Sequence, residues 1–399
     1  MNSLLTSLVT IAQKKEKSVL GLMSGTSMDG LDLALCRIGG HGAQTTVELT
    51  EFRTMPYSPR LKKQLKGIVS VPECSLEEVC LMHGYLGDFM GQAVLEVLEG
   101  WGREPASVDS IASHGQTIYH APAASHQRPG FPHATLQIGD GDHIAQRTGI
   151  LTVSDFRQKH TAAGGEGAPM VALVEQMLFD DSGEDQLLLN IGGIANVTYL
   201  PASTTDAGPV SGDTGPGNTL LDEAARRFLN KPYDTGGECA RSGAVVEPLL
   251  AALREAPYFG LDLPRTTGPE LFNWEYVRKA CQASGVGSIT PENLLTTLTE
   301  FTARTIADAI AGIHPSGALQ VLVSGGGMHN VYLMERLQRH LGEASFLSFG
   351  EKYFNADAKE AVCFAILANE TLSGEGFYTG SAADKRQKKI HPGKISFPN

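Results

Sequence analysis

The sequence predicts an α/β protein built from two domains. The chain has 399 residues, which exceeds the roughly 100–200 residues of an average domain. Long apolar runs, such as QLLLNIGG and LQVLVSGGG, are typical of strands that are buried on both faces of a mixed sheet. Segments with a helical spacing of apolar residues lie between these runs, as they do in α/β proteins.

Strands are expected where short apolar runs end in glycine-rich or polar segments. In chain order they cover residues 18–23, 31–38, 46–54, 108–113, 150–153, 187–191, 196–200 and 319–324. Helical periodicity predicts helices over 75–98, about 293–313 and about 357–372. Ser75 and Glu78 form a capping-box pattern at the start of the first helix. The segments SVLGLMSGTSMDGLDLALCRI and QLLLNIGGIANVTYLP both have the order strand, glycine-rich turn, strand, which indicates two related halves.

Composition excludes several classes of function. A net charge of −12 argues against nucleic-acid binding, because neutralising phosphates requires a basic surface. No stretch approaches the ~20 apolar residues of a membrane span. The apolar residues Leu4 to Ala12 have no preceding basic residue, so no signal peptide is expected. The six cysteines are scattered without a Cys-x-x-Cys pair, which indicates neither disulfides nor a zinc site and predicts a reducing cytoplasm.

Glycine-rich loops follow several of the expected strands: GLMSGTSMDG, NIGGIAN and VSGGGMHN. Main-chain N–H groups in such turns form a nest for anions, and glycine lets the chain approach a phosphate closely. The hydroxyls of Thr26 and Ser27 can add hydrogen bonds, and Asp29 can hold Mg²⁺ through its waters. For any single loop, a hairpin rich in turn-forming residues is the alternative. Neither a Walker A motif nor a G-x-G-x-x-G fingerprint after the first strand is present.

The order of these loops resembles the actin-like ATPase superfamily of sugar kinases, heat-shock ATPases and actin. The chain is similar over about residues 18–372 to the anhydro-N-acetylmuramic acid kinases. The motifs that carry this resemblance are GLMSGTSMDGLD, SHGQTIYH, SDFR, NIGGIANV, DTGPGN, TTGPELFN, SGGGMHN and DAKEAVCFAILA. The fungal levoglucosan kinases share nearly the same set.

The resemblance implies two actin-like (ribonuclease H-like) domains with mixed sheets around a nucleotide cleft. Residues 1–185 would form the first domain with the phosphate-1 loop, and the tail 376–399 would pack back. Residues 186–375 would form the second domain with the phosphate-2 and adenosine loops. ATP and Mg²⁺ are the implied cofactors, with Asp29 at the metal. The implied nucleotide-binding residues are Ser24, Gly25, Thr26, Ser27, Met28, Asp29, Gly30, Asp32, Asn190, Gly192, Gly193, Asn196, Gly325, Gly326, Gly327 and Asn330.

The implied activity is an ATP-dependent kinase for cell-wall recycling. It would open the 1,6-anhydro ring of 1,6-anhydro-N-acetylmuramic acid with water and phosphorylate O6, giving N-acetylmuramic acid 6-phosphate. Attack by water requires a general base, and the resemblance places it at Asp213 in SGDTGPGN. Asp213 lies in an expected Gly-Pro turn before a helix that opens near Thr219. An Asx-turn or a helix cap is the alternative role of this residue.

The implied substrate residues are Thr117, Asp155, Arg157 and Glu360. Asp155 and Arg157 follow a strand, so their side chains can reach a cleft at its end. The alternative for this pair is an internal salt bridge. Glu360 is polar on an otherwise apolar helix, where it either faces the sugar or pairs with a nearby lysine. His114 is expected to be a core histidine with satisfied hydrogen bonds.

The sequence departs from the family pattern at two positions. His160 stands where relatives usually carry Asp, and Glu166 stands where they usually carry Gln. Gln both donates and accepts, whereas charged Glu only accepts, so these departures concern the sugar pocket. Levoglucosan or another anhydrosugar therefore stays an alternative substrate, and a non-catalytic actin-like nucleotide switch is the alternative of a different class. Relatives often pair, so a homodimer is expected.

Overall fold

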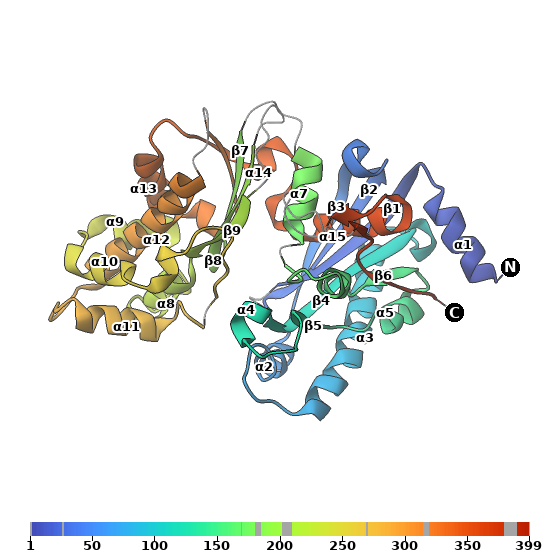
Figure 1. The fold of residues 1–399 in the computed structure, drawn as a ribbon, viewed down its shortest axis with the longest axis horizontal. Coiled ribbons are helices and arrows are strands. Elements are labelled where there is room, and N and C mark those ends of the chain that lie inside the picture. The colour runs from blue at the N-terminus through green and yellow to red at the C-terminus, as the bar shows by residue number, and fades with distance from the viewer. Residues whose placement is uncertain are drawn as a thin grey trace. The chain divides into compact units, whose positions relative to one another are not determined.

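The computed structural model describes residues 2–25, 28–168, 170–179, 185–201, 210–268, 270–313, 319–378 and 389–398. The chain divides into two compact units (Figure 1). Unit 1 contains Met1–Leu178 and Asp357–Asn399, and unit 2 contains Phe179–Ala356. None of the helices in the described segments has the length and apolar character that a membrane span requires.

The sheet of unit 1 begins with an antiparallel meander. Its strands are β1 (Glu16–Ser24), β2 (Gly30–Gly39), β3 (Thr46–Pro56), β4 (Ser110–Ala121), β5 (Ala134–Ile138), β6 (Thr152–Ser154) and β14 (Lys394–Ser396). They are ordered β14-β6-β4-β1-β2-β3, and β5 pairs with β4. β4 runs parallel to both β1 and β6, and β14 from the C-terminal tail pairs antiparallel with β6.

The helices of this part of the chain are α1 (Ser3–Ala12), α2 (Pro59–Lys66), α3 (Leu76–Gly100), α4 (Ala123–His126), α5 (Gly141–Thr148), α6 (Phe156–Ala162), α7 (Val171–Phe179) and α15 (Lys359–Ser373), with short 3₁₀ turns at Gly42–Gln44, Pro105–Ser107 and Ala356–Ala358. Of these helices, α3, α5, α6 and α15 pack against strands of the sheet. The Ser75 hydroxyl accepts from the Glu78 amide at 3.3 Å, which fixes the start of α3. A buried core lies between the sheet and α3; it includes Leu20, Leu22, Leu33, Leu86, Met90 and Ile144. The two-stranded ribbon β12 (Phe377–Tyr378) and β13 (Lys389–Ile390) follows α15.

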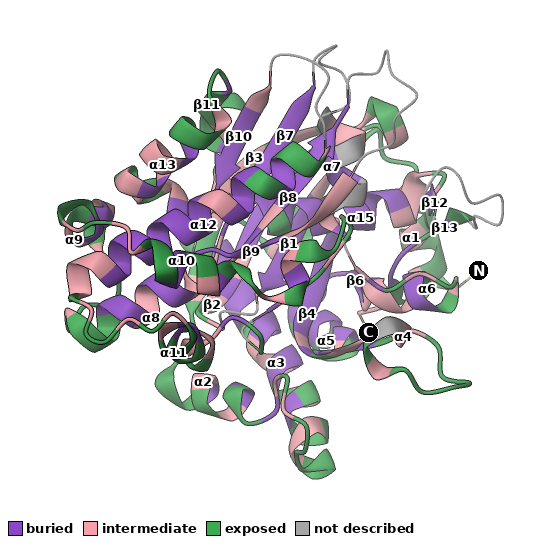
Figure 2. Ribbon diagram, turned by 60° about the vertical axis from the view of Figure 1, so that its left-hand side comes forward, coloured by how far each residue is buried: buried purple, intermediate pink, exposed green. Residues whose placement is uncertain are grey.

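The helix α15 packs against β1, β2 and β4, so it belongs to unit 1 (Figure 1). The resemblance implies that residues 357–375 belong to the second domain, whereas in the structure they belong to unit 1. The helix approaches the sheet closely at Gly21, where a Cβ atom would lie 1.9 Å from the carbonyl oxygen of Ala361. Most of α15 is buried (Figure 2). An apolar helix of this kind does not reveal from its own pattern which sheet it covers.

The sheet of unit 2 repeats the strand order of unit 1. Its strands are β7 (Gln186–Ile191), β8 (Ile194–Leu200), β9 (Val210–Pro216), β10 (Gln320–Ser324) and β11 (Ser345–Ser348), in the order β11-β10-β7-β8-β9. An antiparallel meander is again followed by parallel strands, so β7 corresponds to β1 and β10 to β4. This duplication is the ribonuclease H-like arrangement of actin-like proteins. The predicted α/β class with two such mixed sheets is confirmed.

The helices of unit 2 are α8 (Thr219–Phe228), α9 (Glu238–Ser242), α10 (Glu247–Arg254), α11 (Trp274–Ala283), α12 (Pro291–Ile313), α13 (Val331–Leu341) and α14 (Phe349–Lys352), with 3₁₀ turns at Thr235–Gly237, Pro257–Gly260 and Gly326–His329. The helix α12 is the most deeply buried of them (Figure 2) and packs on β8 and β9. Its Glu300 is fully buried and accepts from Arg304 and Arg336 at 2.6 Å each. These charge-assisted bonds offset the cost of burying the carboxylate.

The predicted strands are present, and most of their ends differ by one or two residues, whereas the strand predicted at 108–113 continues to Ala121. The sequence does not predict the strands β5, β9, β11, β12, β13 and β14. The strand β9 corrects one prediction, because Asp213 lies within it and not in a Gly-Pro turn. The predicted helix start at Thr219 is confirmed.

The close contact at Gly21 gives a test of the packing of α15. Gly21→Ala would place a methyl group against the Ala361 main chain, and overpacking of this kind costs about 1–3 kcal/mol. We expect a lower urea midpoint for unit 1, read from the fluorescence of Trp101 in a Trp274→Phe background, because the chain has two tryptophans, one in each unit. Gly100→Ala is the matched control within unit 1, since its Cβ position lies 3.5 Å from Arg53 Nη1, which is an ordinary contact. Equal midpoints for the two variants would show that α15 tolerates the added methyl.

Candidate active site

One row of residues crosses the sheet of unit 2 at the end where its glycine loops lie. Ser324 of β10 pairs with Asn190 of β7, Asn190 pairs with Asn196 of β8, and Asn196 pairs with Asp213 of β9. Directly opposite residues of paired strands project to the same face of a sheet. The Ser324 hydroxyl donates to Asn190 Oδ1 at 3.3 Å, as this register requires. Polar groups from distant parts of the sequence therefore share one face.

The turn between β7 and β8 consists of Gly192 and Gly193, and it is tied to the start of α8. The carbonyl oxygen of Gly193 accepts from the amides of Gly217 at 2.8 Å and Thr219 at 3.1 Å. The Thr219 hydroxyl donates to the same oxygen at 2.8 Å. The carbonyl of Gly192 accepts from the Asn218 amide at 2.8 Å. Because both carbonyl groups of the turn accept hydrogen bonds from residues at the start of α8, the turn is held in one conformation.

The third glycine loop lies against the second. Gly325 has a φ of +83°, and a Cβ atom there would lie 2.7 Å from Asn190 Oδ1. A Cβ atom at Gly327 would lie 2.2 Å from the Ile191 side chain. Gly326 opens the 3₁₀ turn that follows, and Asn330 Oδ1 then accepts from the Leu333 amide at 3.1 Å to cap α13. Only glycine allows the two loops to approach this closely.

Asp213 has the environment of a base poised near neutral pH. Its Oδ2 accepts from the Thr267 amide at 2.9 Å. Burial raises the pKa of Asp213 to about 6, and the negative charge of Glu270 acts in the same direction. The Thr267 hydrogen bond and the positive charge of Arg265 lower it. A carboxylate whose pKa lies close to neutral pH can accept a proton from water.

The first glycine loop, between β1 and β2, rests on a buried chain of hydrogen bonds in unit 1. The Ser24 hydroxyl donates to Gln116 Oε1 at 2.5 Å, and Tyr57 donates to the Ser24 oxygen at 2.6 Å. The Met28 amide donates to the Gly25 carbonyl at 3.2 Å, and Met28 has a φ of +55°. The predicted residues Thr26 and Ser27 lie outside the described residues.

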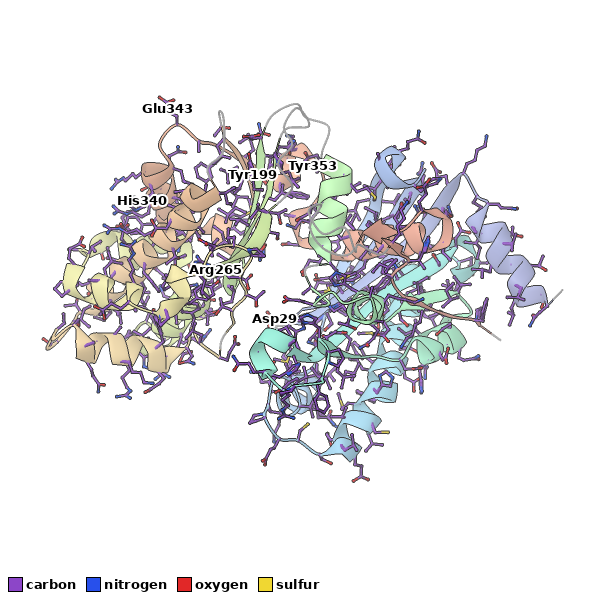
Figure 3. All side chains as sticks on the ribbon, viewed as in Figure 1. Asp29, Tyr199, Arg265, His340, Glu343 and Tyr353 are labelled. Carbon is purple, nitrogen blue, oxygen red and sulfur yellow. The ribbon has the colours of Figure 1, made fainter. Side chains whose placement is uncertain are left out.

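Two carboxylates belong to this hairpin. The side chain of Asp29 is 77% exposed and lies 3.4 Å from Lys62 Nζ (Figure 3). Asp32 Oδ1 accepts from the Thr54 hydroxyl at 2.6 Å, and burial raises the pKa of Asp32. Gly30 is crowded by the next strand, since a Cβ atom there would lie 2.6 Å from the carbonyl oxygen of Met55. Within the described residues, no group of three or more His, Cys, Asp or Glu side chains could hold a metal by itself.

Arg157 is held in place by a histidine that sequence reasoning treated as core. Arg157 Nε donates to His114 Nε2 at 2.9 Å, and Arg157 Nη1 donates to the Gly167 carbonyl at 2.9 Å. His114 Nδ1 lies 2.9 Å from the Gly115 carbonyl, and burial holds the pKa of His114 well below its usual value. His114 is therefore neutral, with its proton on Nδ1. Burial lowers the pKa of Arg157 to about 10, while Glu360 raises it, so the guanidinium stays charged near neutral pH.

The lysine next to Glu360 in the sequence forms an ion pair with another carboxylate. Lys359 Nζ donates to Glu175 Oε1 at 2.9 Å, and this ion pair is buried. Glu360 is exposed at the start of α15, yet desolvation by the surrounding protein raises the pKa of its carboxyl group, while Lys359 and Arg157 lower it. Asp32 also raises the pKa of Glu360. The charges of Arg157 and Asp32 thus act in opposite directions on the pKa of Glu360.

The remaining predicted substrate residues have protein partners. Asp155 Oδ2 accepts from Lys394 Nζ of β14 at 2.5 Å, so its ion pair is with the C-terminal tail and not with Arg157. The Thr117 hydroxyl accepts from Gln137 Nε2 at 3.0 Å and is half-buried. Thr117 thus keeps an accessible surface, whereas the Asp155 carboxylate is bound by Lys394 of the edge strand β14.

His160, one of the departures from the family pattern, supports the loop that follows α6. The His160 Nδ1 atom accepts from the Gly167 amide at 2.8 Å, and the Gly167 carbonyl oxygen accepts from Arg157. The Gly167 main chain is therefore held from both sides. The departure at position 160 consequently shapes the loop that contains Glu166.

A duplicated ribonuclease H-like fold with a glycine loop after the first strand of each sheet is the arrangement of the actin-like superfamily, which includes sugar kinases. The model of the anhydro-N-acetylmuramic acid kinase family matches residues 17–382, and the chain belongs to this family. It is 45% identical to an anhydro-N-acetylmuramic acid kinase of Pseudoalteromonas atlantica over the whole length of both chains. It is 42% identical to one of Pseudoalteromonas translucida, also over both full lengths, and 38% identical to one of Caldanaerobacter subterraneus over 98% of this chain and 99% of that protein. The alternative of a non-catalytic switch is not supported.

Sequence reasoning missed the residues that surround Asp213. Tyr258, Arg265 and Thr267 contact its main chain or carboxylate. The motif TTGPELFN contains Thr267 and directly follows Arg265. The motif marks the segment as part of the family pattern, but it does not indicate what the segment does.

The contact between the second and third loops gives a prediction for nucleotide binding. Gly325→Ala would strain the backbone and crowd Asn190 Oδ1. Strain of about 1–3 kcal/mol would weaken binding of a non-hydrolysable ATP analogue about fivefold or more. Calorimetric titration measures this change. Gly285→Ala is the control, because Gly285 also has positive φ (+67°) but nothing lies within 4 Å of its Cβ position. Parent-like affinity in Gly325→Ala would exclude this loop from the nucleotide site.

Proposed function

We propose that this protein uses ATP and water to convert 1,6-anhydro-N-acetylmuramic acid to N-acetylmuramic acid 6-phosphate. The observation that carries the proposal is the register of the unit 2 sheet, which sets Asp213 in one row with Asn190 and Asn196 beside the glycine loops. The names of the relatives support the choice of sugar. Levoglucosan is not favoured, and a coupled assay with both anhydrosugars discriminates between the two substrates.

The glycine loops would bind the nucleotide phosphates through main-chain N–H groups. The loop of unit 1 that contains Gly25 and the Gly192–Gly193 turn of unit 2 are the two phosphate sites, and the Gly325–Gly327 loop supports the adenosine. Phosphoryl transfer depends mostly on alignment and charge neutralisation. The tight main-chain bonding of these loops supplies that alignment in advance.

Magnesium would be held by the first hairpin. Mg²⁺ retains several waters and is usually bound by one or two carboxylates together with substrate phosphates. The exposed carboxylate of Asp29 and the half-buried carboxylate of Asp32 fit this donor set, and when bound the ion would neutralise phosphate charge. Asp29 is therefore the proposed metal residue.

Asp29→Asn should raise the KM for Mg·ATP and lower kcat, because the variant loses the charge that attracts the metal. Binding of the anhydrosugar should change little. Titration of activity with Mg²⁺ at fixed ATP measures the effect. Lys62→Gln is the control, since it removes the 3.4 Å ion-pair partner and keeps the carboxylate. If Asp29→Asn keeps the parent's Mg²⁺ dependence, the metal is bound elsewhere.

The chemistry at the sugar begins with Asp213. Its carboxylate takes a proton from a water molecule as the water oxygen forms a bond to C1, and the bond between C1 and the bridging oxygen breaks. That oxygen becomes O6 and attacks the γ-phosphorus of ATP, with ADP as the leaving group. Arg157 is the candidate for binding the lactyl carboxylate, and Thr117 and Glu360 are candidates for the sugar hydroxyls.

Asp213→Asn should preserve the fold and lose most of kcat. The amide has the same size but cannot take the proton, and loss of a general base typically costs on the order of 10²–10⁴-fold. Ring opening and phosphorylation should fall together, because O6 becomes an acceptor only when the anhydro bond breaks. Analogue binding measured by calorimetry is the folding control. A variant with near-parent kcat would remove Asp213 from the mechanism.

The pKa of Asp213 sets the acid side of the pH profile. Because the raised pKa is about 6, the charged base is lost as pH falls through that value. We expect kcat/KM to be flat above about pH 7 and to fall about tenfold per unit below about pH 6. A profile that stays flat to pH 4.5 would contradict this assignment.

Assembly and location stay predictions. A homodimer is proposed from the resemblance, and analytical ultracentrifugation tests it. All six cysteines are free thiols, which is typical of a reducing compartment such as the cytoplasm.

A further inference from the structure

The segment of residues 257–267 wraps around the outer edge of β9 at Asp213. The Asp213 amide donates to the Arg265 carbonyl at 2.8 Å, and the Thr267 amide donates to Asp213 Oδ2 at 2.9 Å. A Cβ atom at Gly212 would lie 3.0 Å from main-chain atoms of Arg265. The segment therefore pairs closely with the strand where the proposed base lies.

The side chain of Arg265, labelled in Figure 3, also binds the main chain of β9 at Asp213 and Thr214. Its Nε donates to the Asp213 carbonyl at 3.2 Å and its Nη2 to the Thr214 carbonyl at 3.4 Å. Its Nη1 donates to the Leu261 carbonyl at 2.6 Å. The hydrogen bonds recorded for this guanidinium all go to main-chain carbonyl oxygens, so it joins β9 to the 257–261 turn.

Tyr258 completes the arrangement. Its hydroxyl donates to the Asp213 carbonyl at 2.6 Å, and its ring lies under the Arg265 guanidinium at 4.7 Å. The ring is buried against Phe259 and Phe272 with centroid distances of 5.4 and 5.5 Å. One carbonyl oxygen thus accepts from two side chains that also stack on each other.

We propose that Arg265 and Tyr258 are positioning residues for the reaction, which fix the main chain of Asp213 so that its Oδ1 faces the attacking water. The proposal rests on the proposed role of Asp213 as general base. Within the described residues, Oδ2 is occupied by the Thr267 amide and Oδ1 has no hydrogen-bond donor. Two side-chain donors on the carbonyl fix the peptide plane from which the carboxylate projects. A displacement of about 1 Å can cost about 10²-fold in rate.

Because Arg265 is charged, its removal should change the pKa of Asp213, and the loss of a purely structural residue would not. Among the charged and titratable groups that face Asp213, Arg265 lowers the pKa of its carboxyl group, Glu270 raises it, and Tyr258 is a neutral phenol whose own pKa is raised by burial. The strand β8 presents the neutral Asn196 opposite Asp213.

The helix α12 also packs on β9, and two of its carboxylates form ion pairs with arginines. Glu300 pairs with Arg304 at 2.6 Å, and Asp308 pairs with Arg254 at 2.6 Å. Arg265 is therefore the cation whose removal should move the titration of the base.

The test combines Arg265→Met, Arg265→Lys and Tyr258→Phe with full pH profiles of kcat and kcat/KM. Arg265→Met removes the hydrogen-bonding guanidinium and its positive charge. Loss of the hydrogen bonds should lower kcat about 10–100-fold. Loss of the charge should move the acid limb, the fall in activity at low pH, upward by about 0.5–1 pH unit. Arg265→Lys keeps the charge, so the limb should stay in place while kcat falls. Tyr258→Phe should lower kcat about tenfold with the limb unmoved.

Arg254→Met is the matched control. Arg254 lines the same pocket of about 1010 Å³ as Arg265, and its partner is Asp308. Its loss removes one positive charge near β9 without touching Asp213, so kcat and the limb should match the parent. Thermal unfolding and analogue binding of each variant identify a folding defect, and Tyr258→Phe tests the positioning role if Arg265→Met does not fold.

The outcomes separate this inference from the proposed function. If Asp213→Asn is inactive while Arg265→Met and Tyr258→Phe retain the parent's kcat and acid limb, the positioning role is wrong and the base assignment stands. If Asp213→Asn is active, the proposed base itself fails. A limb that moves in Arg265→Met but not in Arg265→Lys supports the inference.

Discussion

The proposed site depends on one constraint, the pairing register of the first strand in each sheet. The strand β7 pairs antiparallel with β8 and parallel with β10, so residues that are far apart in the sequence reach the same end of the sheet. The strand β1 has the same two kinds of neighbour in unit 1. Because side chains alternate between faces, a slip of one residue would turn Asn190 and Ser24 to the opposite face.

The sequence predicted the parts of the structure that local patterns encode. Apolar runs marked the hairpins of both sheets, and glycine spacing marked the loops between them. Asp213 was expected in a turn because Gly212, Gly215 and Pro216 are turn-forming residues. In the structure, a register shift opposite Ala195 and Asn196 accommodates an extra residue, and Gly215 adopts a φ of +144°, so the strand continues to Pro216. Such a bulge re-aims side chains without ending the strand.

Contacts between distant segments were beyond prediction from the sequence. The bond from Arg157 to His114 spans 43 residues, and the bond from Arg265 to Asp213 spans 52. Neither pair has a characteristic spacing, and a buried histidine has the same local pattern whether or not it orients an arginine. The ion pair of Asp155 with Lys394 spans 239 residues and likewise has no local signal. The charged partners and the burial of these residues can be determined only when the pairing of the strands is known.

The position of α15 in unit 1 has a consequence for the order in which the protein forms during synthesis. Unit 2 is one continuous segment, whereas unit 1 is interrupted by it. Until α15 has been made, one face of β1, β2 and β4 lacks the helix that buries it. At ~5–20 residues per second, the intervening segment of about 180 residues takes on the order of 10–30 s to synthesise. The first unit to begin on the ribosome is therefore the last to be completed, and chaperones would meet its apolar sheet during that interval.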